Sequence, residues 1–97
     1  MNDFGLSERT INELLRYFKT KPEIEKVLIY GSRAKGTYKN GSDIDFAILE
    51  NIDAVKISSE LDELSTPYKF DVTDYNNLTH EGLKNSIKND GKLFYEK

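Results

Sequence analysis

The sequence predicts an α/β fold in which helices pack around a small mixed β-sheet. Apolar residues at helical spacing alternate along the chain with short apolar runs that are typical of strands. Segments rich in Gly, Pro, Asn and Asp separate these runs and mark turns. The expected order is α-β-α-β-α-β-α with a further short strand at the end, which favours a sheet covered by helices.

Length and composition narrow the class of protein. The 97 residues suffice for one hydrophobic core, and we expect residues 1–97 to form a single domain. A net charge of −3 argues against a dedicated nucleic-acid-binding protein. The absence of cysteine excludes disulfides and thiolate metal sites. Since we find neither a signal peptide nor an apolar run of ~20 residues, we expect a cytoplasmic protein without a membrane partner.

The first helix and the first strand have clear boundaries. Ser7 is a suitable N-cap, and apolar residues follow on one helical face from Ile11 to Phe18. Pro22 disfavours helix at the residue before it and so ends this element. The run Ile24–Tyr30 is apolar on both faces near its end, which indicates a strand covered on both sides.

A polar loop links this strand to a second one. Ser32–Lys35 predicts a short helix that Gly36 closes, and the loop Thr37–Ser42 contains an Asn-Gly turn signal. The second strand is Asp43–Leu49. Because the link is about a dozen residues and contains a turn, we expect the two strands to be antiparallel neighbours.

The second half of the chain repeats the alternation. Asp53–Leu64 predicts an amphipathic helix, and Tyr68–Thr73 predicts a third strand. The apolar positions of this helix are Val55, Ile57, Leu61 and Leu64. Asn77 or Thr79 is the expected N-cap of a last helix, and Leu93–Tyr95 is a candidate edge strand.

Two features of the linking segment indicate chemistry. Gly31 and Ser32 stand where the first strand ends and a helix begins, a position that exposes backbone N–H groups to an anion. Asp43 and Asp45 project from one face of the second strand, because side chains alternate along a strand. Carboxylates about 6–7 Å apart repel by roughly 2–3 kcal/mol at an effective dielectric near 20. A divalent cation such as Mg²⁺ removes that repulsion, so we expect a site for a metal–nucleotide complex.

A third carboxylate would complete a site for two cations. Asp71 lies on the polar face of the third strand, and it converges on Asp43 and Asp45 if that strand lies beside the second. Asp74 is the competing candidate if the predicted register is wrong.

The remaining candidates rest on weaker signals. Arg33 is a predicted nucleotide-binding residue through a phosphate contact, although a cation on the surface of a helix is an equal alternative for both Arg33 and Lys35. His80, the one histidine, is expected at the surface or as a cap. Tyr30 and Tyr38 are candidates for contact with a base.

The spacing of these residues resembles a known family. Gly31-Ser32, ten residues, and then Asp43-Ile44-Asp45 match the G-S-x10-D-x-D signature of the DNA polymerase β-like nucleotidyltransferases. The longer string G-S-R-A-K-G…S-D-I-D-F resembles the minimal nucleotidyltransferases, or MNT proteins. The resemblance implies a polymerase β palm-like fold, with Gly31 and Ser32 on the phosphates of ATP. It also implies that Asp43, Asp45 and Asp71 hold two Mg²⁺ ions and carry the catalysis.

The same resemblance suggests a partner. Many MNT proteins are antitoxins of a toxic HEPN ribonuclease and add AMP to one of its tyrosines. We therefore expect a nucleotidyltransferase that acts on a partner protein, as a hetero-oligomer or with a second copy of the chain. Two alternatives stay open, a catalytically inactive nucleotide-binding antitoxin that acts by steric contact, and an enzyme whose acceptor is a small molecule such as an aminoglycoside.

Overall fold

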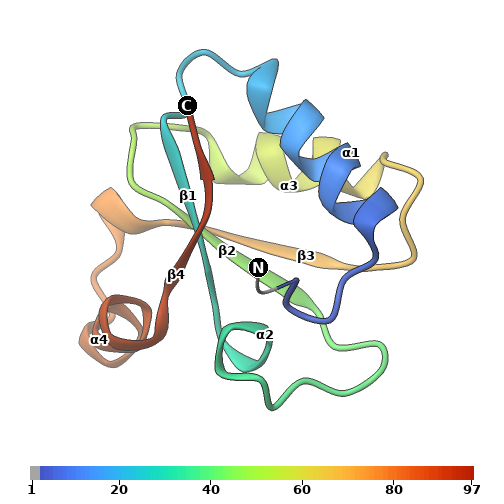
Figure 1. Ribbon diagram of the computed structural model, residues 1–97. Coiled ribbons are helices and arrows are strands. Elements are labelled where there is room, and N and C mark those ends of the chain that lie inside the picture. Colours follow the sequence, from blue (N-terminus) through green and yellow to red (C-terminus); the bar gives the residue numbers. More distant parts are fainter. Residues whose placement is uncertain (1–2) are drawn as a thin grey trace.

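Helices and strands alternate along the chain as the sequence predicts (Figure 1). The computed structural model describes residues 3–97. Its elements are α1 (Glu8–Lys19), β1 (Lys26–Tyr30), α2 (Ser32–Lys35), β2 (Ile44–Ile48), α3 (Ala54–Asp62), β3 (Phe70–Asp74), the short 3-10 turn η1 (Tyr75–Asn77), α4 (Glu81–Asp90) and β4 (Lys92–Glu96). Within this part of the chain, none of the helices has the length and apolar character needed to cross a bilayer.

The strands form a four-stranded mixed sheet in the order β3-β2-β1-β4. β1 is antiparallel to both β2 and β4, which confirms the predicted pairing of the first two strands. β2 and β3 run parallel. Because parallel strands need a crossover connection, α3 and its flanking loops lead the chain from the end of β2 back to the start of β3.

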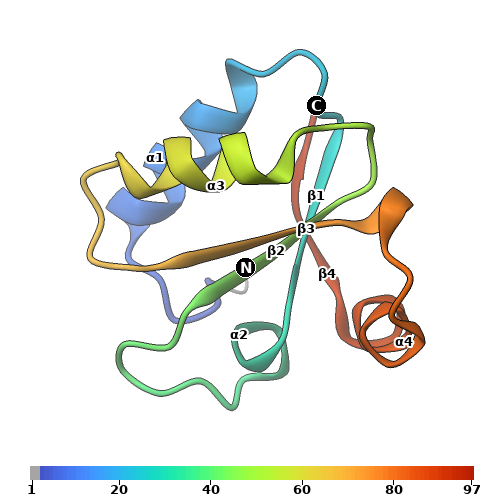
Figure 2. The ribbon, with the colours of Figure 1, turned by 180° about the vertical axis from the view of Figure 1, so that it is seen from behind.

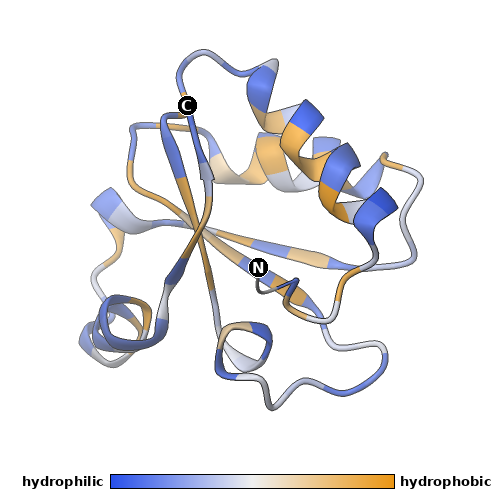
Figure 3. Cartoon of the chain, viewed as in Figure 1, coloured by the Kyte–Doolittle hydropathy of each residue, from blue (hydrophilic) through white to orange (hydrophobic). Residues whose placement is uncertain are grey.

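The main core lies between the sheet and the pair α1 and α3, which lie on the same side of it (Figures 1 and 2). α1 buries Leu14 and Phe18 there, and α3 buries Ile57 and Leu61. The ring of Phe18 packs edge-on against Phe46 of β2, with 5.4 Å between centroids. Figure 3 shows hydrophobic residues on both helices and along the strands beside them.

The opposite side of the sheet carries a smaller apolar cluster. Ile87 of α4 is buried there with Tyr30 of β1 and Ala47 of β2. Partly buried Leu28 and Leu83 pack against these residues. α4 therefore covers one part of this face, around the β1–β2 pair.

Two expectations for the helices are wrong in detail. The N-cap of α4 is neither Asn77 nor Thr79 but His80, whose Nδ1 accepts the backbone N–H of Leu83 at 2.9 Å. Val55 is 80% exposed although it was expected in the core. Since residues two apart on a helix lie about 200° apart, Val55 cannot share the buried face of Ile57.

Candidate functional site

The face that α4 leaves partly open carries a row of polar side chains across three strands. Tyr30 of β1 lies directly opposite Asp45 of β2, and Asp45 lies directly opposite Asp71 of β3. Side chains of directly opposed residues share one face of a sheet. The sheet thus brings Asp71 next to Asp45, which the sequence could only suggest. Asp74 lies three residues further along β3, so its side chain starts on the other face.

Gly31 connects Tyr30, the first residue of this row, to the start of α2 at Ser32. Its backbone has φ 73° and ψ −153°, a conformation that is essentially restricted to glycine. A Cβ at this position would lie 2.5 Å from Oδ2 of Asp45. The Asp45 carboxylate therefore lies directly against the backbone where β1 ends and Ser32 begins α2. The two halves of the predicted motif are in contact.

The electrostatics of Asp45 reflect this crowding. Burial, together with repulsion from Asp71 and then Asp43, raises the pKa of Asp45 from 3.8 to about 6. The Arg33 guanidinium acts in the opposite direction. An acid whose ionised form is destabilised by burial and by two like charges is typical of functional sites.

Asp45 and Asp71 share a face of the sheet, and Asp43, which directly precedes β2, acts electrostatically on Asp45, but the three carboxylates do not form a complete metal site. Asp43 and Asp71 are exposed, whereas Asp45 is half-buried. As the side chains of residues 3–97 are placed, no group of three or more His, Cys, Asp or Glu is arranged to hold a metal ion. The donor type nevertheless suits Mg²⁺, which prefers carboxylate oxygens, and a cation would relieve the repulsion at Asp45. The metal site therefore stays a prediction.

A hydrogen bond between side chains of β1 and β3 stabilises the sheet beside the aspartates. The Tyr30 hydroxyl and Thr73 Oγ1 are 2.8 Å apart, so the bond joins β1 to β3 across β2. Burial raises the pKa of Tyr30, and the charges of Asp71 and Asp45 add to this increase. Tyr30 is a candidate for contact with a base on sequence grounds, but its side chain is 5% exposed and hydrogen-bonded within the sheet.

Arg33 is placed differently from the sequence-based expectation of a residue that faces a phosphate. It is only 2% exposed. Its Nε and Nη2 both donate to the Ser42 carbonyl, at 3.2 and 2.9 Å, and Nη1 donates to the Phe4 carbonyl at 2.9 Å. The guanidinium also lies over the rings of Tyr38 and Tyr68, 5.1 and 4.8 Å from their centroids. This burial argues against a direct contact between Arg33 and a phosphate. No periodicity in the sequence indicates that the Arg33 side chain is buried.

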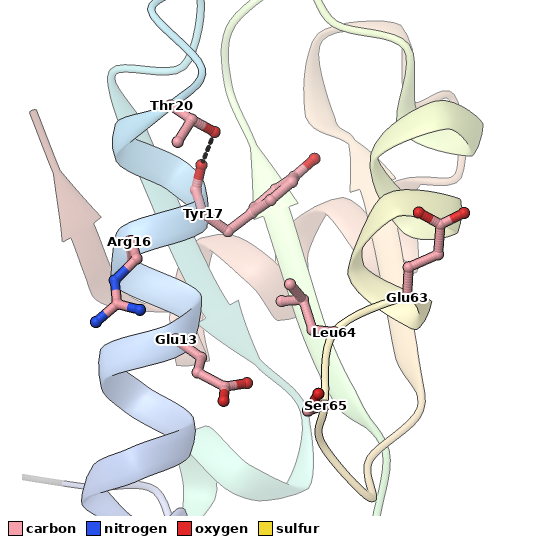
Figure 4. Close-up of a pocket in the computed structure, with 7 residues that line it drawn as sticks. All are labelled: Glu13, Arg16, Tyr17, Thr20, Glu63, Leu64 and Ser65. Atoms are coloured by element: carbon pink, nitrogen blue, oxygen red, sulfur yellow. Dashed lines mark hydrogen bonds between the residues drawn. The ribbon is translucent and has the colours of Figure 1, made fainter.

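A separate cavity of about 420 Å³ lies between α1 and the end of α3 (Figure 4). Its lining residues are Glu13, Arg16, Tyr17, Thr20, Glu63, Leu64 and Ser65. Most of these residues are polar, and the predicted site residues do not line the cavity. Asp71 instead borders a hollow of about 370 Å³ beside α3, together with Val72 and Ser58.

The fold and the site together define a class of protein. A mixed sheet with Gly31-Ser32 at the end of one strand, and with aspartates on the next two strands, has the polymerase β nucleotidyltransferase fold. The family model "Polymerase beta, Nucleotidyltransferase" matches residues 12–97, and the chain belongs to this family.

Several solved structures are similar to this chain. A chain in the crystal structure of a toxin–antitoxin with AMP-PNP is 28% identical, with a TM-score of 0.63 over 95% of this chain and 75% of that one. A chain of the toxin–antitoxin MntA–HepT is 16% identical, with a TM-score of 0.68 over 94% and 74%. A chain from the complex of a tri-AMPylated Shewanella oneidensis HEPN toxin with its MNT antitoxin is 16% identical, with a TM-score of 0.69 over 95% and 74%. No curated protein sequence matches the chain significantly.

Proposed function

We propose that this chain is a Mg²⁺-dependent nucleotidyltransferase that transfers AMP from ATP to a hydroxyl group of a HEPN-domain partner, and that it thereby acts as an antitoxin. The observation that carries the proposal is the contact of Gly31 with Asp45, which itself lies opposite Asp71. This arrangement brings the turn that we propose to bind phosphate next to a row of carboxylates. The 28% identical chain from the toxin–antitoxin structure with AMP-PNP supports the choice of an adenine nucleotide and of a toxin as the partner, and the complex of a HEPN toxin with its MNT antitoxin motivates the choice of a HEPN-domain protein.

Each residue has a defined part in the proposed reaction. Backbone N–H groups at Gly31 and Ser32 bind the β- and γ-phosphates, since a strand end followed by a helix start exposes such donors. Asp43, Asp45 and Asp71 would hold two Mg²⁺ ions. When bound, these ions neutralise the triphosphate and polarise the acceptor hydroxyl. We assign the proton of that hydroxyl to Asp71, because it is the exposed carboxylate on the outer strand.

The bond changes are those of a single displacement. The acceptor oxygen forms a bond to the α-phosphorus, and the bond from that phosphorus to the bridging oxygen of the β-phosphate breaks. Pyrophosphate leaves and AMP remains on the acceptor. No covalent intermediate on the protein is required, since positioning and electrostatic stabilisation carry the catalysis in this kind of transfer.

A test uses ATP labelled at either the α- or the γ-phosphate, with Mg²⁺ and a HEPN partner. We expect covalent label on the partner from α-labelled ATP alone. The double variant Asp43→Asn, Asp45→Asn is expected to abolish transfer while it stays folded, because it removes repulsion and no packing. Glu8→Gln, which neutralises an exposed carboxylate in the first turn of α1, is the control and keeps full activity. Label from γ-labelled ATP, or transfer by the double variant at the wild-type rate, contradicts the proposal.

One observation favours a second candidate, an antitoxin that binds its partner without chemistry. Among residues 3–97 the acidic side chains are not gathered into a finished metal site. A steric antitoxin would form a tight complex and silence the toxin with no label from either ATP. Under that candidate the double variant would neutralise the toxin as well as the wild type, and this outcome distinguishes the two functions.

A further inference from the structure

The loop between Gly36 and Asp43 separates the two halves of the candidate site. Most of its residues are exposed. Two of its hydrogen bonds are internal, from the Ser42 N–H to the Lys39 carbonyl and from the Lys39 N–H to Ser42 Oγ. These bonds close the loop on itself, but they do not fix its end relative to α2. The pairing of Tyr30 with Asp45 places β2 beside Gly31, and a further contact holds the peptide that leads into Asp43.

Arg33 makes that contact. It is the second residue of α2, and two of its nitrogens donate to the carbonyl oxygen of Ser42, the residue before Asp43. A guanidinium that donates two hydrogen bonds to one carbonyl oxygen fixes both the orientation of that peptide group and its distance from the arginine. The peptide that leads into Asp43 is therefore held to the helix that begins at Ser32.

The same side chain also holds the N-terminal turn. Nη1 donates to the carbonyl of Phe4, a residue with the positive φ of 56°. A non-glycine residue rarely adopts this conformation, so the surroundings must stabilise it. The next residue, Gly5, lies against Tyr38, because a Cβ there would overlap the Tyr38 ring. Arg33 thus connects three segments at one buried point.

We propose that Arg33 is a positioning residue of the nucleotidyltransferase site, which fixes Asp43 relative to Gly31-Ser32 through the carbonyl of Ser42. The inference rests on the function proposed above for those residues. It assigns to Arg33 an indirect role in place of a phosphate contact. Lysine cannot replace it, because a single ammonium group cannot bond the Ser42 carbonyl twice and also reach Phe4.

The experiment compares Arg33→Lys with the wild type in amide hydrogen exchange and in AMP transfer. We expect faster exchange in residues 39–43 and in the N-terminal turn around Gly5, whose neighbour Phe4 also loses its bond to Arg33, and in no other part of the domain. We also expect the Mg²⁺ concentration for half-maximal transfer to rise about 10-fold or more, as is usual when a group that orients a metal ligand is lost. At saturating Mg²⁺ the KM for ATP should change by less than about 3-fold, because the phosphate-binding backbone is intact.

Two further variants keep the test informative. Tyr38→Leu removes the exposed ring over the guanidinium but leaves the hydrogen bonds of Arg33. We expect a smaller increase in loop exchange and in the Mg²⁺ requirement than for Arg33→Lys. This variant decides the question if Arg33→Lys fails to fold. Tyr17→Phe is the matched control, since it removes a 2.6 Å hydrogen bond to Glu60 on the helical side of the sheet. It should lower stability without a change in Mg²⁺ dependence.

The outcomes separate this inference from the proposed function. A large rise in the KM for ATP with unchanged Mg²⁺ dependence would show a direct phosphate contact and overturn the inference. Faster exchange throughout the domain would show a general structural role and would also overturn it. If the wild type transfers no AMP, the proposed function fails, whereas the exchange at residues 39–43 still decides whether Arg33 positions the loop.

Discussion

Replacing Asp45 by asparagine should stabilise the protein at neutral pH while it destroys the proposed activity. The folded state raises the pKa of Asp45 from 3.8 to about 6, so ionised Asp45 disfavours folding above pH 6. A shift of about two units corresponds to roughly 3 kcal/mol, since each unit is worth about 1.4 kcal/mol. Because the side chain is only half-buried, screening by solvent reduces this to about 1.5 kcal/mol. We expect a Tm roughly 6–12 °C higher at pH 8 without metal.

The sign of the effect depends on pH. As pH falls below 3.8 the carboxyl group becomes mostly protonated in both the folded and the unfolded state, so the stability of the variant and that of the wild type should be nearly equal at pH 3.5. The gain then grows as pH rises from about 4 to about 6 and stays constant above. Thermal unfolding of both proteins at pH 3.5, 5 and 8, with chelator present, measures this profile.

Magnesium provides the second half of the assay. Mg²⁺ at pH 8 should raise the Tm of the wild type and leave that of Asp45→Asn nearly unchanged, because binding to the folded state alone stabilises it. Glu8→Gln on α1 serves as the control and should respond to Mg²⁺ as the wild type does. The electrostatic account of the site would be refuted if Asp45→Asn were less stable than the wild type at pH 8. It would also be refuted if the variant gained as much stability over the wild type at pH 3.5 as at pH 8.

Three further substitutions test the geometry. Gly31→Ala should destabilise the fold by about 1–3 kcal/mol and abolish transfer, because its backbone conformation suits only glycine and the new methyl group displaces the Asp45 carboxylate; chemical denaturation and the labelling assay measure both effects. Tyr30→Phe removes the hydrogen bond to Thr73 and should cost about 1 kcal/mol, with the free energy of unfolding as the readout; no loss would show that the bond is not formed. His80→Ala should cost about 1 kcal/mol through the lost N-cap, with amide exchange faster in the first turn of α4 than elsewhere.

The sequence was sufficient for those features that depend on neighbours along the chain. The Ser7 cap, the apolar face of α1 and the antiparallel pairing of β1 with β2 follow from periodicity and turn residues, and the structure confirms them. The glycine between β1 and α2 belongs to the same class, since its positive φ follows from a tight strand-to-helix turn. Local rules also indicated the face that Asp43 and Asp45 share.

Features that depend on distant segments could not be predicted. The parallel pairing that places Asp71 opposite Asp45 joins residues on either side of a crossover, and no local pattern fixes its register. The buried position of Arg33 requires the Phe4 carbonyl and the Tyr68 ring, which other parts of the chain supply. A charged residue in a polar loop offers no signal that it will be enclosed.

The partly open second face of the sheet has a consequence for water. Asp43 and Asp71 are exposed, so solvent reaches the place where we expect the acceptor hydroxyl to attack. Charges act more strongly when water is excluded, and a closed site prevents hydrolysis of the donor. A partner that docks over β2 and β3 would supply the acceptor hydroxyl and would at the same time exclude solvent from the site. This chain would then form only one side of the enclosed active site, and the protein to be modified would form the other side.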